Sequence, residues 1–247
     1  MDERLAAWLT ALDERHLANL THSEAARALR ALSSCYVERR AKLARGGALD
    51  TAGKRAAFAL FYAPLHFLVT REVVRALPDA TRHVARIVDV GCGTGSAGAA
   101  WAMECGNARV TGVDRHPWAV AEAAWTYRQL GLSGRAARSD AERMTIDGGT
   151  GTAILAAYAV NELDGKAREI LLPRLVAAHE RGARVLVIEP IARRPATWWP
   201  VWERRIREAG GRADQWRFQV PLPPTQRALA RSAGLNPREL TARTLWI

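Results

Sequence analysis

The sequence predicts an α/β protein in which a doubly wound, mostly parallel seven-stranded sheet with an antiparallel last strand follows an N-terminal helical region. Three observations predict this fold. From residue 85 onward, short apolar runs alternate with helical segments, which is typical of a parallel sheet with helices on both faces. A glycine-rich stretch follows the first run, and the residues before it show helical spacing of apolar side chains. We therefore expect a helical region at 1–82 and a sheet domain at 83–247.

The N-terminal region contains clear helix signals. Thr21 and Glu24 match a capping box, because the Thr21 hydroxyl can cap the first turn and Glu24 can reach back to it. The helix that follows should stop at the glycine pair 46–47. A further helix is expected at 54–77, with an interruption at Pro64.

The alternating part supplies the elements of the sheet in order. Strands are expected at 85–90, 108–113, 135–139, 152–160, 183–188, 216–220 and 241–247. Helices are expected near 96–105, 117–130, 166–181, 197–208 and 225–233. Because crossovers between parallel strands are right-handed, the carboxyl ends of the strands meet at one edge of the sheet, which is where ligands bind.

The charge of the chain bears on the kind of partner that it could bind. The formal net charge is +11, yet residues 83–165 hold seven basic against nine acidic residues. Basic flanks favour a polyanionic partner such as RNA, although an arginine-rich proteome would give the same balance.

The three cysteines form no C-x-x-C pair, which indicates neither disulfides nor a metal site and fits a reducing cytoplasm. The N-terminus does not resemble a signal peptide. The most apolar stretch, 56–69, is too short to span a bilayer, so no membrane partner is predicted.

The glycine-rich stretch after the first strand contains two overlapping signatures. A G-x-G-x-G begins at Gly91, and a G-x-G-x-x-G, the pattern of dinucleotide-binding sites, begins two residues later. Because the strand should end at Val90, Gly91 is the residue that turns the chain. The second pattern would put its last glycine, Gly98, inside the helix, where we expect an ordinary helix residue. The register therefore favours the first signature, whose glycines let the backbone approach a cofactor: Gly91, Gly93 and Gly95.

Three carboxylates are expected along the same edge. Asp89 lies in a strand buried on both faces, where a carboxylate is costly unless it is paired. It can hold the ammonium group of S-adenosylmethionine, which NAD lacks, or it can bond the amides of the glycine loop. Asp114 ends the second strand and can accept hydrogen bonds from both ribose hydroxyls. Asp140 can bond an adenine amino group or cap a following helix. Together these residues predict S-adenosylmethionine as the cofactor.

The segments “VDVGCGTG”, “VTGVD” and “ARSD” resemble the first three motifs of the class I S-adenosylmethionine-dependent methyltransferases, and “RTLWI” resembles their antiparallel last strand. The resemblance covers residues 83–247 and implies a Rossmann-like fold. It implies cofactor contacts from Asp89, Gly91, Gly93, Gly95, Asp114 and Asp140. We add three neighbours to the predicted cofactor site: Cys92, Arg115 and Tyr158. Trp118 either flanks the adenine or packs in the core.

Methyl transfer is expected at the exit of the fourth strand, in “AVNEL”. Positioning can supply much of the rate, and a base is needed only when the acceptor must lose a proton. We predict Asn161 and Glu162 as the catalytic residues. Asn161 can hold an amino or carbonyl group, and Glu162 can be a base, a substrate ligand or a surface residue. The Asn-Pro-Pro-Tyr tetrad of adenine and glutamine N-methyltransferases is absent, as is the cysteine that cytosine C5 methylation needs at these strand exits.

The segments “AAYAVNEL” and “VLVIEP” are similar to the mitochondrial small-ribosomal-subunit methyltransferase-like family and its bacterial relatives, although the C-terminal cysteine cluster of that family is missing here. This similarity implies an RNA substrate, with ribosomal RNA favoured. The basic segment after the fifth strand predicts Arg193 and Arg194 as contacts to an anionic substrate. Trp199 is expected to lie off the buried stripe of its helix and to stack on a base.

Two alternatives to an RNA methyltransferase remain open from the sequence. One is a small-molecule methyltransferase, in which residues 1–82 form a lid over a largely apolar pocket. The other is a non-catalytic ribosome-assembly factor that keeps the cofactor fold.

Overall fold

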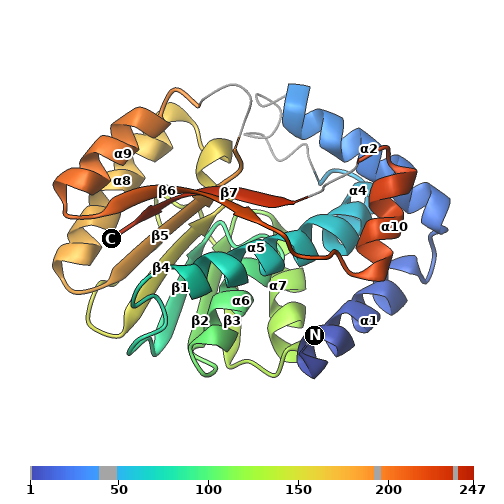
Figure 1. The fold of residues 1–247 in the computed structure, drawn as a ribbon, viewed down its shortest axis with the longest axis horizontal. Helices are drawn as coiled ribbons and strands as arrows, with labels where there is room; N and C mark the ends of the chain where they lie inside the picture. Colours follow the sequence, from blue (N-terminus) through green and yellow to red (C-terminus); the bar gives the residue numbers. More distant parts are fainter. Residues whose placement is uncertain (1, 39–48, 192–195, 236–238) are drawn as a thin grey trace.

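The computed structural model describes residues 2–38, 49–191, 196–235 and 239–247 and has the predicted α/β architecture (Figure 1). Within these residues one sheet has the strand order β3-β2-β1-β4-β5-β7-β6. Strands β1 to β5 pair in parallel, and β7 is antiparallel to both of its neighbours. The strands are β1 (Arg86–Val90), β2 (Arg109–Asp114), β3 (Gly134–Arg138), β4 (Thr152–Ala157), β5 (Arg184–Glu189), β6 (Arg212–Phe218) and β7 (Leu240–Trp246). The strand order reverses between β1 and β4, which places a ligand site at their carboxyl ends.

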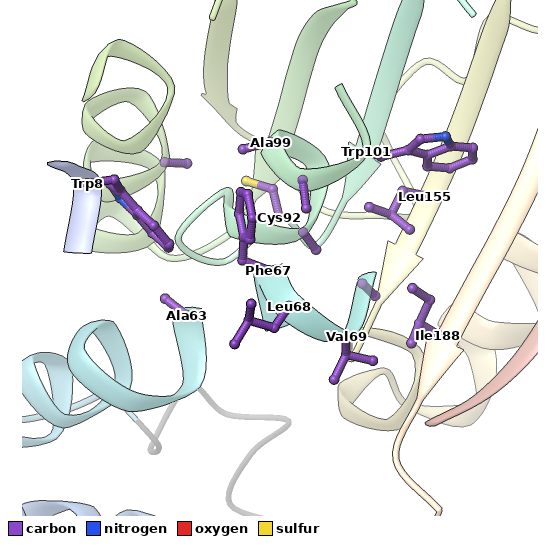
Figure 2. Packing of buried hydrophobic residues seen from close by; sticks show 14 of the residues in the cluster. Trp8, Ala63, Phe67, Leu68, Val69, Cys92, Ala99, Trp101, Leu155 and Ile188 are labelled. Carbon is purple, nitrogen blue, oxygen red and sulfur yellow. The ribbon is translucent and has the colours of Figure 1, made fainter. Parts of the chain in front are cut away.

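Helices cover both faces of the sheet and enclose two hydrophobic clusters. One face carries α5 (Ala63–Ala76), α6 (Ser96–Glu104) and α7 (Pro117–Gln129), and the other carries α8 (Gly165–Glu180) and α9 (Trp199–Glu208). Figure 2 shows the first cluster, in which side chains of α1, α5, the glycine loop, α6, β4 and β5 meet. The central strand β4 is buried along its whole length, which explains its uninterrupted apolar sequence.

Two strands differ from the prediction by three residues or more at one end. β4 ends at Ala157 rather than at 160, and a short 3₁₀ turn, η2 (Val160–Glu162), follows it. β6 spans Arg212–Phe218 rather than 216–220. It is an edge strand with one neighbour, so its polar and apolar residues alternate. Because its first half contains no continuous apolar run, the apolar pattern of the sequence predicts only its second half.

The predicted interruption at Pro64 is wrong, because the chain stays helical from 52 to 76. A π-helical turn, η1 (Phe58–Tyr62), joins α4 (Ala52–Ala57) to α5, and Pro64 occupies the first turn of α5. A proline leaves the carbonyl four residues earlier without its helical donor, which here is the carbonyl of Leu60. The buried side-chain amide of Gln226 donates to that carbonyl at 2.8 Å, so the π-turn and Gln226 together accommodate the proline.

This helix is also longer than the apolar stretch considered in the sequence. It has 25 residues, and by length and composition alone it is suited to cross a membrane. However, 67% of the most apolar 18-residue stretch of this helix is buried inside the protein, as expected for a helix of the core.

A helical layer gathers beside the sheet from both ends of the chain (Figure 1). It contains α1 (Glu3–Leu17), α2 (His22–Glu38), α4 and α10 (Pro224–Ser232). The capping box of α2 is confirmed, because the Thr21 N–H donates to the Glu24 carboxylate at 2.8 Å and the Glu24 N–H to the Thr21 hydroxyl at 3.3 Å. The predicted stop at 46–47 lies outside the described residues. Thr225 of α10 donates to Asp13 of α1 at 2.6 Å, so the segment between β6 and β7 completes the layer.

Glu122 joins this layer to the sheet domain, and its replacement by glutamine should destabilise the fold by about 2 kcal/mol. Its buried carboxylate lies 2.7 Å from His16 Nε2 and 3.2 Å from the guanidinium of Arg15. Burial alone would raise the pKa of Glu122, but the hydrogen bonds and charges of His16 and Arg15 lower it. The stabilisation is therefore present above the unfolded pKa of about 4.3 and lost as pH falls through the lowered folded value.

Urea unfolding of Glu122→Gln measures this effect. Glu104→Gln is the control, because Glu104 pairs with Arg75 at 2.9 Å on the surface and its loss should cost less than about 1 kcal/mol. Equal costs for the two variants would contradict a special role for the Glu122 cluster.

Candidate active site

The glycine loop connects β1 to α6 as the register predicts. β1 ends at Val90, and Gly91, Gly93 and Gly95 adopt φ values of +68°, +52° and +75° before α6 begins at Ser96. A Cβ atom at Gly91 would lie 2.6 Å from Cβ of Ala159. The absence of a side chain there lets the loop approach the residues that follow β4.

Asp89 is buried beneath this loop, with 1% of its surface exposed. Burial raises its pKa to about 7, the negative charge of Asp114 adds to this rise, and a hydrogen bond from the Gly98 N–H to Oδ2, at 3.1 Å, opposes it. The prediction that Gly98 is an ordinary helix residue is wrong, because a Cβ atom there would lie 2.5 Å from Asp89 Oδ2. Gly98 lets the carboxylate reach the first turn of α6.

Asp114 ends β2 and holds two backbone amides. Its Oδ2 accepts from the Gly93 N–H at 3.0 Å, and its Oδ1 accepts from the His116 N–H at 2.8 Å. A carboxylate has lone pairs for further donors, so it can still accept from a ligand. Arg115 is exposed beside it. Asp140 is exposed after β3, and its carbonyl rather than its carboxylate accepts the bonds of the turn that follows.

Residues that follow β4 lie at the same edge as the loop. Tyr158 has a left-handed φ of +59°, which is uncommon for a bulky residue. Burial raises the pKa of Glu162 to about 7, and the charge of Asp114 adds to that rise while Arg115 opposes it. The charges that act on Glu162 thus belong to residues at the end of β2 and just after it.

The comparisons with known proteins identify the chemistry of this edge. Residues 87–182 match the family model described as a methyltransferase domain. Over these residues the chain has a methyltransferase domain. The matched range begins in β1 and ends after α8, so it includes the glycine loop and the three carboxylates. S-adenosylmethionine is therefore the cofactor. A search of curated protein sequences found no match.

Solved structures share the fold of the methyltransferase domain. The mitomycin 7-O-methyltransferase MmcR is 18% identical, with a TM-score of 0.55, over 97% of this chain and 71% of that chain. The S-adenosylmethionine-dependent methyltransferase SibL in its apo form is 20% identical, with a TM-score of 0.52, over 96% of this chain and 73% of that chain. Magnesium protoporphyrin IX methyltransferase (ChlM) from Synechocystis PCC 6803 with bound SAH is 14% identical, with a TM-score of 0.51, over 74% of this chain and 82% of that chain. The first two likenesses extend through the N-terminal helices, and the comparisons give no support to the narrower similarity to the mitochondrial ribosomal family.

The residues present fit this cofactor. The glycine loop carries no side chain at Gly91 or Gly93 that would keep a ligand from its backbone, and Asp89 is a buried carboxylate without a cationic partner within the described residues. Thr94 in the loop has a buried hydroxyl that finds no hydrogen-bond partner within the described residues. A buried polar group of this kind is costly unless a ligand satisfies it. The ammonium and carboxylate groups of an amino acid match these two features.

Asn161 is held from both sides by the protein. Its side-chain amide donates to the buried carboxylate of Glu189, and its Oδ1 accepts from Trp198 Nε1 at 3.1 Å. Burial raises the pKa of Glu189 to about 8, against hydrogen bonding from Asn161 and the charge of Arg243. The catalytic role predicted for Asn161 remains a prediction, and these contacts favour positioning of the η2 turn. Glu189 is not among the site residues predicted from the sequence, although it lies in the segment “VLVIEP”.

Trp199 does not lie off the buried stripe, so that prediction is wrong. It is buried with Trp202 and Ile206 of α9, and the Arg243 guanidinium lies 3.9 Å from its ring centroid. The predicted stacking face is therefore occupied by a residue of β7. The predicted substrate contacts Arg193 and Arg194 lie outside the described residues.

The fully buried ring of Tyr127 packs against the glycine loop. Cβ atoms at three glycines would lie within 3 Å of Tyr127, namely Gly95, Gly112 and Gly134. The Tyr127 hydroxyl contacts the thiol of Cys92, whose pKa is raised by burial. The Cys92 side chain therefore faces the core, and only its backbone can face the cofactor. The three glycines are far apart in the sequence, and no local pattern indicates that one ring fills the space that they leave.

Proposed function

We propose that this methyltransferase acts on a small molecule. The observation that carries the proposal is that the helix at 52–76 covers the strand-exit edge. A Cβ atom at Gly93 would lie 3.9 Å from the Phe58 ring, and the His66 ring stacks on Tyr158 with 3.8 Å between centroids. A site closed by uncharged aromatic side chains suits a small molecule better than a polyanion.

Two solved structures with the same fold support this reading by their names. MmcR is a mitomycin 7-O-methyltransferase, and ChlM is a magnesium protoporphyrin IX methyltransferase. Both act on small molecules. The proposal thus favours the lid that the sequence offered as an alternative over the RNA-binding surface.

The carboxylates have distinct roles in this proposal. When bound, S-adenosylmethionine supplies an electrophilic methyl group on a sulfonium centre. Asp89 holds the ammonium group, Asp114 accepts hydrogen bonds from the ribose hydroxyls, and Asp140 accepts one from the adenine amino group. The cofactor is bound by the backbone of the loop at Gly91, Gly93 and Gly95. Asn161 fixes the turn that presents Glu162 to the acceptor.

Glu162 is the proposed base, and Glu162→Gln should lower kcat/KM by about 10²-fold. Because its pKa is raised to about 7, the rate of the unaltered enzyme should rise with pH and level off above about 7, where the carboxylate is ionised. The variant should lose that dependence. Glu169→Gln, at an exposed position of α8, is the control. An unchanged pH profile in Glu162→Gln would show that Glu162 is not the base.

The substrate class is tested with methyl-labelled S-adenosylmethionine. Purified protein is incubated with cell lysate that has been separated into small molecules, RNA and protein. The proposal expects label in the small-molecule fraction. Label confined to RNA or to protein would overturn it.

A further inference from the structure

A cavity of about 360 Å³ lies on the α8 face of the sheet, over β1, β2 and β3. Val88 of β1 is paired in register with Thr111 of β2, which is paired in turn with Arg135 of β3. Arg86 and Val113 each lie two residues from this row, so their side chains are on the same face. The sheet therefore presents one continuous surface to the cavity, whose volume is typical of small-ligand pockets.

The outer wall of the cavity belongs to the segment 139–147, which consists of turns and irregular chain. The Arg174 guanidinium of α8 donates to the carbonyls of Ala141 and Glu142, at 3.0 Å and 2.9 Å. Met144 is buried in the hydrophobic cluster that this face shares with α8. The wall is therefore held by side-chain contacts rather than by secondary structure.

The lining of the cavity is basic, with three arginines against one carboxylate, that of Asp147. Arg86 is half-buried, and Arg135 and Arg143 are exposed. None of the three forms an ion pair within the described residues. The Arg86 guanidinium donates to the Thr152 hydroxyl at 3.1 Å, and a guanidinium has five N–H donors, so Arg86 can also donate to a ligand.

The other lining residues add hydroxyl groups and an apolar surface. The hydroxyls belong to Thr111, Ser139 and Thr145. The buried apolar side chains are those of Val88, Val113 and Met144. Guanidinium groups bind phosphate oxygens with paired, charge-assisted hydrogen bonds, and the apolar side chains favour an organic group. The lining thus matches a ligand with an anionic head and an apolar body.

We propose that this cavity binds a small organic phosphate, whose phosphoryl group is held by the three arginines and whose apolar part lies on Val88 and Val113. Among the described residues that line the cavity, none belongs to the glycine loop, so this is a second site beside the cofactor site. It adjoins the cofactor site because Ser139 directly precedes Asp140, the predicted adenine contact. The site does not depend on which molecule accepts the methyl group.

The test uses phenyl phosphate, which combines a dianionic head with an apolar ring. Its binding to protein saturated with S-adenosylhomocysteine is measured by calorimetric titration, so that the cofactor site is already filled. We expect saturable binding that is about tenfold tighter than the binding of inorganic phosphate or of phenol, because each of these lacks one half of the ligand. The affinity should fall as the salt concentration rises.

Arg86→Gln and Arg135→Gln should each weaken the binding of phenyl phosphate by about tenfold, because each removes a charge-assisted hydrogen bond. Arg135 is exposed on the edge strand β3, so its replacement should leave the fold intact. Arg128→Gln is the matched control, because Arg128 is an exposed arginine of α7, on the opposite face of the sheet, and its affinity should not change. Thermal stabilisation by S-adenosylhomocysteine shows that each variant is folded.

A single-stranded RNA of about ten nucleotides is the competing ligand, and it should not displace phenyl phosphate. Displacement by this RNA would assign the arginines to an RNA-binding surface and overturn the proposal. No saturable binding of phenyl phosphate, or equal affinities in the unaltered protein, Arg86→Gln and Arg135→Gln, would overturn it as well. Inorganic phosphate that binds as tightly as phenyl phosphate would contradict the organic part of the ligand.

Discussion

Gly91→Ala is expected to abolish detectable S-adenosylmethionine binding, which corresponds to a loss of at least about 10³-fold. Gly91 has a φ of +68°, and a Cβ atom there would lie 2.6 Å from Cβ of Ala159. Two backbone segments, the glycine loop and the exit of β4, would have to move apart. We expect a loss of about 2–4 kcal/mol in the free energy of unfolding, from the left-handed conformation and the overlap together.

Gly106→Ala separates these two causes. Gly106 has a φ of +69°, and a Cβ atom there would meet nothing within 4 Å. The control variant therefore carries only the conformational cost of about 1–2 kcal/mol and should bind the cofactor as the unaltered protein does. Calorimetric titration and urea unfolding give both quantities. If Gly91→Ala bound the cofactor as tightly as Gly106→Ala, the loop would not have the role assigned to it.

Asp89→Asn should weaken S-adenosylmethionine binding by about 10³-fold, because the ammonium group would be left without its buried anionic partner. The same change should stabilise the unliganded protein at pH 7.5. The folded pKa of Asp89, about 7, lies above its unfolded value of about 3.9. The folded state therefore holds an extra proton between these values, and stability falls as pH rises through that window.

Asparagine removes this cost and still offers an oxygen to the Gly98 N–H. The melting temperature of Asp89→Asn without ligand should exceed that of the unaltered protein above pH 7, and the difference should vanish below about pH 4. Asp147→Asn, at an exposed position, controls for net charge. A variant that is both less stable above pH 7 and undiminished in cofactor binding would show that Asp89 serves the fold alone.

Much of the sheet domain could be predicted because its signals are local. The end of β1 at Val90 follows from the apolar run and the glycine after it, and Asp114 marks the end of β2 in the same way. Each depends on a few consecutive residues, and so does the capping box at Thr21. The strands of the buried centre were found within a few residues of their observed ends because burial on both faces demands continuous apolar sequence.

The features that could not be predicted depend on residues far apart in the chain. His66 and Tyr158 are separated by four strands and two helices, β1 to β4 with α6 and α7, and each alone is an ordinary aromatic residue. Gln226 completes the helix around Pro64 from near the other end of the chain. The sequence around Gly98 does not show why a glycine is needed there, because the need comes from Asp89, whose carboxylate reaches Gly98 across the loop. Tertiary contacts of this kind leave no periodic pattern.

The most direct test of the central claim is a calorimetric titration of the purified protein with S-adenosylmethionine and, separately, with NAD. The glycine-rich stretch contains the signatures of both cofactor classes, and the register of β1, the buried Asp89 and the methyltransferase-domain match assign it to the first. We expect saturable binding of S-adenosylmethionine and no detectable binding of NAD. Tighter binding of NAD than of S-adenosylmethionine would contradict this assignment.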